Sequence, residues 1–356
     1  MKKLAIALSL LPAAAAVQAQ SNVTLYGLVD AGVEVVNHAN AAGDSVTRLT
    51  SGAMNTSRWG LRGSEDLGGG LKVLFQLEGG LFIDTGAIDG QIFRRQANVG
   101  LEGGFGRLIA GRSYTTAYDF MLPFDPMGYA PAYSWATTGN ATSAAAAGSS
   151  YGMTTAFDNL LKYQGTFGGF KVGATYGFGE VAGASSAGRR YALGVGYAAG
   201  PFSAALAGER VNAPMSAVPQ SRTTAYHLGL GWQLNNAVAL KAGARHYKQE
   251  PAAAGAELRA NTYWAGVNWQ ATPAVALAAA LYFQDQRNLA TEGDPKMLVL
   301  RAKYALSKRT DLYAITGHAR ARNGQVVGLT RDVSPQGVTG FSDTQTGVVV
   351  GVQHRF

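Results

Sequence analysis

The chain has 356 residues, of which 47 are glycine and none is cysteine, and its formal net charge is +8. Only 15% of the residues are charged, whereas ordinary soluble domains carry about 25%, and the hydrophobic fraction of 47% argues against disorder. The absence of cysteine from the chain excludes disulfide scaffolds, thiolate zinc sites and cysteine nucleophiles.

Residues 1–19 are predicted to form a signal peptide. Lys2 and Lys3 give a positive start, and Leu4–Ala16 is apolar but too short to span a bilayer. Val17–Gln18–Ala19 then offers the small residues that a signal peptidase reads. We expect cleavage after Ala19, so that a mature domain of residues 20–356 remains; a membrane anchor is the alternative.

The segment Asn22–Val36 is the first predicted strand. Its odd positions are apolar or glycine and its even positions are mostly polar, as in a strand with one apolar and one polar face. Leu71–Phe82 alternates in the same way. After the signal peptide, no stretch reaches the roughly 18 uninterrupted apolar residues that a membrane-spanning helix needs.

Short turns rich in glycine, proline or asparagine divide the rest of the chain, and each is a candidate hairpin. They are residues 67–70, 103–106, 167–169, 200–201, 235–236, 271–273 and 307–310. These seven turns join seven strand pairs and leave one strand at each end. The sequence therefore predicts sixteen strands, with eight longer connections on the opposite side.

This pattern predicts an all-β, antiparallel transmembrane barrel. The polar face carries Lys72, Gln76 and Glu78, which could not fill a dry core, so a soluble β-protein is the weaker alternative. Aromatic residues near strand ends suit two interfacial girdles. They are Tyr26, Trp59, Tyr163, Tyr197, Trp232, Tyr263, Trp264, Trp269 and Tyr304. A barrel of sixteen strands is too wide for side chains to fill, so an aqueous channel is expected.

Six motifs along the mature chain carry a resemblance to a known family. They are Thr24–Gly27, Ser57–Gly68, Gly111–Arg112, Phe124–Gly128, Leu306–Tyr313 and His354–Phe356. With them the chain resembles the general-diffusion porins of Gram-negative bacteria, in particular the β-proteobacterial group of Bordetella, Burkholderia and Comamonas. The resemblance implies a 16-stranded outer-membrane barrel, usually a homotrimer, that passes ions and small hydrophilic solutes and needs no cofactor.

The connection between Arg112 and Asp158 is much longer than the others. The resemblance implies that this third external loop, about residues 114–157, folds into the barrel and narrows it. Asp119 and Asp125 would then face arginines on the wall. The run Phe120–Met127 is too apolar for a loop that lies in water, although a solvated surface loop is the alternative.

The alternation also places the wall arginines. Because Trp59 and Leu61 take the lipid face, Arg58 and Arg62 should point into the lumen. In Phe93–Leu101 the same rule predicts that Arg94 points inward and that Arg95 points outward near the rim. Because strand ends often break the alternation, both arginines remain candidates for the constriction. Arg112 lies where a strand meets the long loop. The predicted constriction is therefore Arg58, Arg62, Arg94, Arg95, Arg112, Asp119 and Asp125.

No catalytic or metal site is predicted. Gly148–Gly152 matches the G-x-S-x-G pattern, but it lies in a low-complexity loop and not between a strand and a helix. The five histidines show no metal-ligand spacing.

The chain ends on a further alternating segment. Phe356, His354, Val352, Val350 and Val348 share one face, and this strand should pair with Asn22–Val36 to close the barrel. By the resemblance, Phe356 is the signal that the barrel-assembly machinery reads. The alternative is that it is one more girdle aromatic.

We therefore expect a passive outer-membrane channel with a weak to moderate anion preference, because wall arginines outnumber loop acids. A solute-specific channel, for instance for small carboxylates, and a structural or adhesive barrel remain alternatives. The expected partners are outer-membrane lipid and lipopolysaccharide, further copies of the chain, the assembly machinery, and small ions and solutes. Nucleic acid is not among them.

Overall fold

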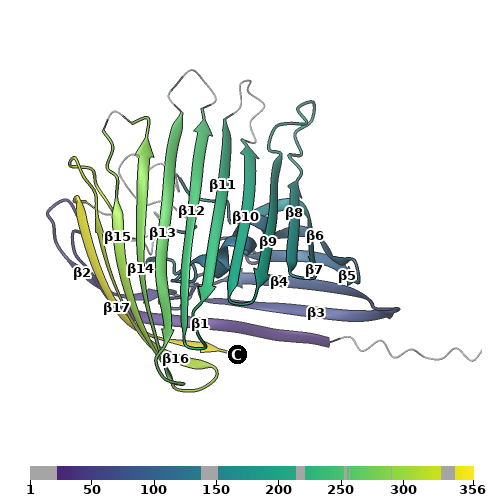
Figure 1. Cartoon of the computed structure of the whole chain (residues 1–356), viewed down its shortest axis with the longest axis horizontal. Coiled ribbons are helices and arrows are strands. Elements are labelled where there is room, and N and C mark those ends of the chain that lie inside the picture. Colours follow the sequence, from purple (N-terminus) through teal and green to yellow (C-terminus); the bar gives the residue numbers. More distant parts are fainter. Residues whose placement is uncertain are drawn as a thin grey trace, which may run out of the picture.

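The computed structural model describes residues 22–137, 151–213, 221–251, 255, 257–289, 291–329 and 341–356. The predicted signal peptide lies outside these residues. All the strands belong to one antiparallel sheet. In Figure 1 the strands from β8 to β14 stand side by side on the near side, and β1, β3 and β4 cross behind them.

The strands are β1 (Asn22–Val36), β2 (Val46–Ser51), β3 (Arg58–Gly68), β4 (Leu71–Gly80), β5 (Gln96–Gly103), β6 (Gly106–Tyr114), β7 (Ala156–Phe167), β8 (Phe170–Gly177) and β9 (Arg190–Ala199). They continue with β10 (Phe202–Asn212), β11 (Arg222–Gln233), β12 (Val238–Glu250), β13 (Leu258–Gln270), β14 (Val275–Arg287), β15 (Lys296–Ala305), β16 (Thr310–Arg320) and β17 (Thr344–Arg355). Helix α1 (Thr116–Met121) and the 3-10 helix η1 (Leu122–Phe124) lie between β6 and β7. Among the described residues, neither helix is long and apolar enough to cross a membrane.

The sheet closes on itself as a barrel of sixteen strands. β3 pairs with the first half of β1 and β2 pairs with its second half, so that β2 and β3 form one interrupted strand. Counting them as one reduces the seventeen segments to sixteen. β1 also pairs with β17, from Leu28 opposite Arg355 to Val36 opposite Gly347. The predicted sixteen-stranded antiparallel barrel is confirmed, and β1 has the predicted bounds.

All seven predicted hairpin turns are present, and they join β3 to β4, β5 to β6, and so on to β15 and β16. The first of them shows why glycine marks these turns. Gly68, Gly69 and Gly70 have φ angles of 83°, 61° and 81°. Only glycine adopts this left-handed backbone without a steric cost.

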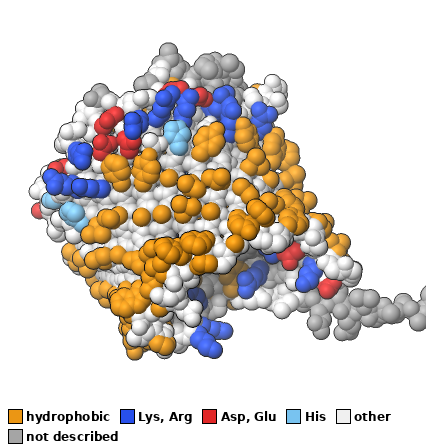
Figure 2. All heavy atoms as spheres, in the orientation of Figure 1, with side chains coloured by type: hydrophobic (Ala, Val, Ile, Leu, Met, Phe, Trp, Pro, Cys, Tyr) orange, Lys and Arg blue, Asp and Glu red, His pale blue; other side chains and the backbone are white. Residues whose placement is uncertain are grey.

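The two faces of the sheet differ as the alternation predicts. On β1, Val33 and Val35 are 55% and 46% exposed, whereas Asp30 and Glu34 are buried. Figure 2 shows the outer face as a broad hydrophobic band, bordered above by charged side chains. Because the sheet is closed, each strand has a hydrogen-bonded neighbour on both sides, as a lipid environment requires.

The predicted aromatic girdle is only partly correct. Tyr197, Trp232, Tyr263, Trp269 and Tyr304 are well exposed on the outer surface.

Tyr26 and Trp264 point inward instead. Tyr26 donates its hydroxyl to Glu78, and Trp264 is 3% exposed and donates its ring N–H to the Phe124 carbonyl. Tyr26 occupies an even position of β1, as Asp30 does. The alternation thus decides which way a residue faces, and the aromatic type alone does not.

Candidate pore constriction

The segment of residues 116–137, which follows β6, packs against the inner face of the barrel. Helix α1 contacts β8 to β11, and η1 contacts β11 and β12. Glycines on the wall make room for it: a Cβ at Gly229 would lie 2.3 Å from the Phe124 ring, and one at Gly266 would lie 2.6 Å from Pro126. Further along, the Tyr133 hydroxyl donates to Glu34 of β1 at 2.9 Å. The segment therefore lines the inner wall from β8 around to β1.

Basic side chains on the barrel wall hold this segment in place by hydrogen bonds to its backbone carbonyls. Arg301 donates to the carbonyls of Met127 at 3.0 Å and Pro126 at 3.4 Å. Arg245, which is 1% exposed, donates to the carbonyls of Ala136 and Trp135.

Lys241 donates to the Asp125 carbonyl at 3.4 Å. The sequence reasoning missed Lys241, Arg245 and Arg301. For Lys241 and Arg301 the signal was available, because they alternate with the exposed apolar residues Leu240 and Leu300.

Asp125 is not an open pore acid, and this prediction is wrong. Its side chain is fully buried. The carboxylate accepts hydrogen bonds from the backbone N–H groups of Tyr129 at 2.6 Å and Met127 at 3.2 Å. It also accepts from the hydroxyls of Ser134 at 2.8 Å and Tyr282 at 2.5 Å. An aspartate that caps its own turn organises the loop, and the bond to Tyr282 ties that turn to β14.

Asp119 faces a lysine and not one of the predicted arginines. It lies in α1, and its carboxylate forms an ion pair with Lys162 of β7. The Gln164 side-chain amide donates to the same oxygen at 2.6 Å. The Lys162 side chain is only 4% exposed. The pair therefore brings little net charge to this part of the wall.

Arg58 and Arg62 lie on the inner face of β3, as predicted. Arg62 is exposed, and its guanidinium lies 5.0 Å from the centre of the Tyr26 ring. Arg58 donates to the Thr56 carbonyl at 3.1 Å. Neither arginine makes an ion pair with a carboxylate in the part of the chain that the structure describes.

Arg95 also points inward, so its outward assignment is wrong. It forms an ion pair with Glu78 at 2.7 Å, and its guanidinium lies 5.5 Å from the centre of the Tyr114 ring. The alternation fails here because β5 begins only at Gln96, and Arg95 still belongs to the preceding connection.

Arg94 and Arg112 do not join this cluster. Arg94 pairs with Asp89 in the connection between β4 and β5, at 2.9 Å. Arg112 lies opposite Ala97, and directly paired residues point to the same face. That face is the outer one, since Val99 on it is 53% exposed.

The guanidinium of Arg112 pairs with Asp158. Its predicted place on the inner wall is therefore wrong. Its even position, shared with the exposed Leu108, already indicated the outer face.

The chain terminus completes the barrel. Phe356 exchanges backbone hydrogen bonds with Gly27 at 3.0 and 3.1 Å, and its ring covers Gly27. Val348 and Val350 are 47% and 60% exposed, and Val349 is fully buried, as the alternation predicted. The role of Phe356 as an assembly signal stays a prediction.

The inner face of β3 thus presents Arg58 and Arg62 without a carboxylate partner among the described residues. On the loop side the Tyr118 ring stacks on Tyr114, with ring centres 4.4 Å apart. A water-facing arginine keeps its charge at any physiological pH. This arrangement can attract anions along one side of the channel.

The remaining predictions concern catalysis and metals. Gly148, Ser149 and Ser150 of the G-x-S-x-G pattern lie outside the described residues. Within the described ranges, no group of three or more histidine, aspartate or glutamate side chains could hold a metal ion.

Comparisons with known proteins agree with one another. The model of the Gram-negative porin family matches residues 5–324. The outer membrane porin protein 32 of Delftia acidovorans is 35% identical over 365 residues, which cover all of both chains. The structure of an anion-selective porin from Comamonas acidovorans is 30% identical, with a TM-score of 0.82 over 95% of this chain and 100% of that one.

A more distant structure, the trimer form of OmpT from Vibrio cholerae, has a TM-score of 0.71 and is 16% identical, covering 94% of this chain and 99% of that one. At this identity the likeness concerns the fold alone.

Proposed function

Because this chain belongs to the Gram-negative porin family, we propose that it is a passive channel for ions and small hydrophilic solutes with a weak to moderate preference for anions. The family predicted from the sequence motifs is confirmed. With it, the outer membrane is the location of the protein. The solved Comamonas relative is itself described as anion-selective.

One observation carries the preference for anions. Arg62 is exposed on the inner face of β3 and has no carboxylate partner among the described residues, and the same holds for the half-buried Arg58. The acids nearby are already engaged, since Glu78 pairs with Arg95 and Asp119 pairs with Lys162. The net potential on this side of the lumen is therefore positive.

We place the selective passage between this wall and the loop. The loop covers the inner face from β8 around to β1, and its Tyr118 stacks on Tyr114 at the edge of the arginine wall. Anions would pass Arg58 and Arg62, whose guanidinium groups are always charged and carry several hydrogen-bond donors.

The finer predictions remain proposals. We propose cleavage after Ala19, a homotrimer in the outer membrane, contacts with outer-membrane lipid and lipopolysaccharide, and no catalysis. We also propose that Phe356 is read by the assembly machinery. Normal outer-membrane abundance of Phe356→Ser would contradict the last of these.

The test is single-channel recording in a planar bilayer under a KCl gradient. The proposal predicts a reversal potential that favours chloride. A potential that favours potassium would contradict it. Conductance that saturates with a small carboxylate would instead support the solute-specific alternative.

A further inference from the structure

The side of α1 and η1 that faces the lumen is apolar. The opposite side of α1 packs on the inner wall and consists of Thr116, Ala117, Phe120 and Met121. Residues four positions apart lie on one face of a helix, so Tyr118 and Leu122 point away from that wall, into the lumen. Leu122 is 38% exposed, and Pro123 beside it is exposed as well. We call Tyr118, Leu122 and Pro123 the apolar edge of the loop.

Neither acid of this segment lies open beside the apolar edge. Asp119 is the only charged residue of α1 and η1. Its carboxylate pairs with Lys162 and accepts a hydrogen bond from Gln164. Asp125, which follows η1, is fully buried. A solute that meets the edge therefore contacts carbon atoms and not a free carboxylate.

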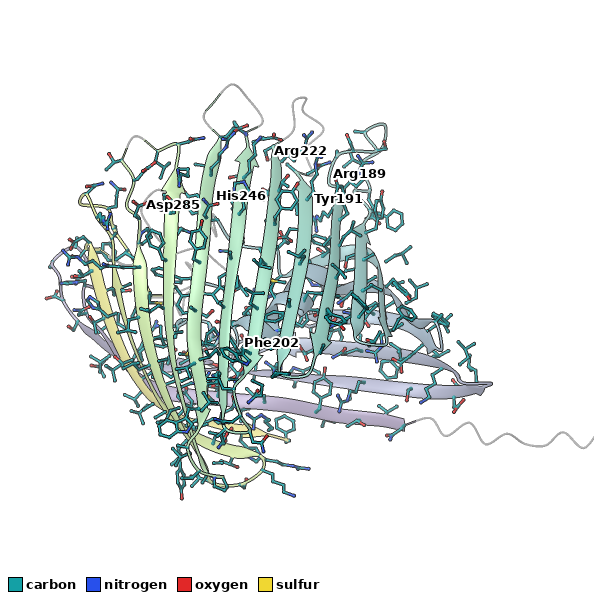
Figure 3. The ribbon with its side chains drawn as sticks, viewed as in Figure 1. Arg189, Tyr191, Phe202, Arg222, His246 and Asp285 are labelled. Carbon is teal, nitrogen blue, oxygen red and sulfur yellow. The ribbon has the colours of Figure 1, made fainter. Side chains whose placement is uncertain are left out.

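The apolar edge lies inside the barrel and not at its rim. Figure 3 labels one residue at each end of the neighbouring strands β10 and β11, Phe202 beside a short turn and Arg222 at the opposite end. Phe124, the last residue of η1, packs against Gly229 of β11, which lies between these two levels. A solute that crosses the barrel must therefore pass the level of the edge.

A continuous row of contacts joins the apolar edge to the arginines of the wall. Tyr118 stacks on Tyr114 with 4.4 Å between the ring centres, and the Tyr114 hydroxyl donates to Glu78 at 3.3 Å. Glu78 also accepts from the Tyr26 hydroxyl at 2.8 Å, and the Arg62 guanidinium lies 5.0 Å from the centre of the Tyr26 ring. A cationic wall and an apolar edge therefore border the same passage.

We propose that this passage favours organic anions that have a compact apolar body, such as monocarboxylates with an aromatic or alicyclic ring. The guanidinium of Arg62 would bind the carboxylate, because its donors form a fork that matches two carboxylate oxygens. The ring would cover Leu122 and Pro123 and so remove apolar surface of both partners from water. A hydrophilic anion of the same charge gains only the first contact. The inference rests on the proposed function, because it names the solutes that the same passage selects.

The test compares benzoate with lactate, a smaller anion that carries the same charge on a polar body. The purified, assembled protein is recorded in a planar bilayer with KCl on one side and the potassium salt of either anion on the other. The reversal potential then gives the permeability of each anion relative to chloride. A pore that sorts by size alone passes lactate faster. The wild type should instead pass benzoate about threefold faster than lactate, because apolar surface leaves water at the edge.

Leu122→Asn should lower the ratio of benzoate to lactate permeability about threefold, since the polar side chain removes most of the apolar contact. Leu122→Met keeps an apolar side chain and should retain the wild-type ratio. The matched control is Leu306→Asn, because Leu306 is 56% exposed in the short turn between β15 and β16. It should leave the ratio unchanged.

A wild type that passes lactate faster than benzoate would overturn the inference. So would a Leu122→Asn variant that keeps the wild-type ratio, or a Leu306→Asn variant that loses it equally. If chloride is still favoured over potassium in those cases, the proposed function stands without the apolar preference. A reversal potential in a KCl gradient that favours potassium would contradict the proposed function itself.

Discussion

Two walls of the barrel carry inward-pointing cations, and they use them differently. On β12 and β15, Arg245 and Arg301 lie under the loop and donate to its carbonyl oxygens. On β3, Arg58 and Arg62 are not covered by the loop and have no carboxylate partner among the described residues. An inward-pointing arginine therefore either binds the loop backbone, as Arg245 and Arg301 do, or faces the solute, as Arg58 and Arg62 do. The path of the loop decides between the two.

The reason lies in the backbone of the loop. After η1, residues 125–137 of the segment form no helix or strand, so they have carbonyl groups that their own backbone does not satisfy. The wall supplies donors: Trp264 and Asn268 bind the carbonyls of Phe124 and Pro126 at 3.0 and 2.9 Å, and the covered cations bind those of Asp125 to Ala136. Those cations stabilise the narrow channel but do not meet the ions that pass through it.

The largest effect is expected from removing the two covered arginines. Arg245→Ala/Arg301→Ala should detach the loop, because each buried carbonyl left without a donor costs about 1–3 kcal/mol. Single-channel conductance should rise, and the thermal unfolding temperature should fall. Lys303→Ala is the matched control, since Lys303 lies two residues from Arg301 and pairs with Asp311 at 3.6 Å. Unchanged conductance in the double variant would mean that other contacts hold the loop.

Replacing the two loop acids, Asp125 and Asp119, should have different effects on the channel. Asp125→Asn leaves N–H and O–H donors facing an amide that can no longer accept all of them, so the loop should loosen and conductance should rise moderately. Ion selectivity should change little, because Asp125 is fully buried. A large change in selectivity with unaltered conductance would place Asp125 in contact with the permeating ions.

Asp119→Asn should change the net charge of the inner wall and alter the structure of the loop only slightly. It frees Lys162, whose side-chain nitrogen is paired with Asp119, and the reversal potential should move further toward anions. Lys162→Met/Asp119→Asn, which removes both charges, should return it to the wild-type value. A shift that persists in the double variant would show that the pair is not the cause.

The smallest effect concerns Tyr133, whose hydroxyl donates to Glu34 at 2.9 Å. Burial, followed by the nearby Glu34 carboxylate, raises the pKa of Tyr133 above its usual range. The neutral phenol therefore stabilises the folded state below pH about 10, the pKa of an unfolded tyrosine, and this contribution is lost as pH rises further. Tyr133→Phe should cost about 1 kcal/mol at neutral pH, and its unfolding free energy should fall less steeply above pH 10 than that of the wild type. Parallel pH curves for the two proteins would contradict this account.

The sequence predicts the regular parts of this molecule well. The bounds of β1 and the inward orientation of Arg58 and Arg62 follow from an alternation of period two, and the seven turns follow from their glycine, proline and asparagine residues. Both signals depend only on neighbouring residues. Arg112 also obeys the alternation, which puts it on the outer face with Leu108, and its position beside the loop does not turn it inward. Arg95 lay just before a strand, where no alternation applies.

The rest of the site depends on the path of the loop. The alternation along a strand predicts neither the burial of Asp125 nor the hydrogen bonds from Arg245 and Arg301 to the loop. They arise from contacts between residues more than a hundred positions apart, such as Arg245 with Ala136 and Arg301 with Met127. Within a strand the alternation identifies which cations point inward, and only the structure separates those that the loop covers.

The most direct test of this separation is the reversal potential of Arg58→Gln/Arg62→Gln in a planar bilayer under a KCl gradient. Both side chains lie on the inner face beyond the loop, so their replacement should move the potential toward cations and leave the loop in place. The account predicts this shift with conductance close to that of the wild type. An unchanged reversal potential would contradict the claim that these two arginines select the permeating ions.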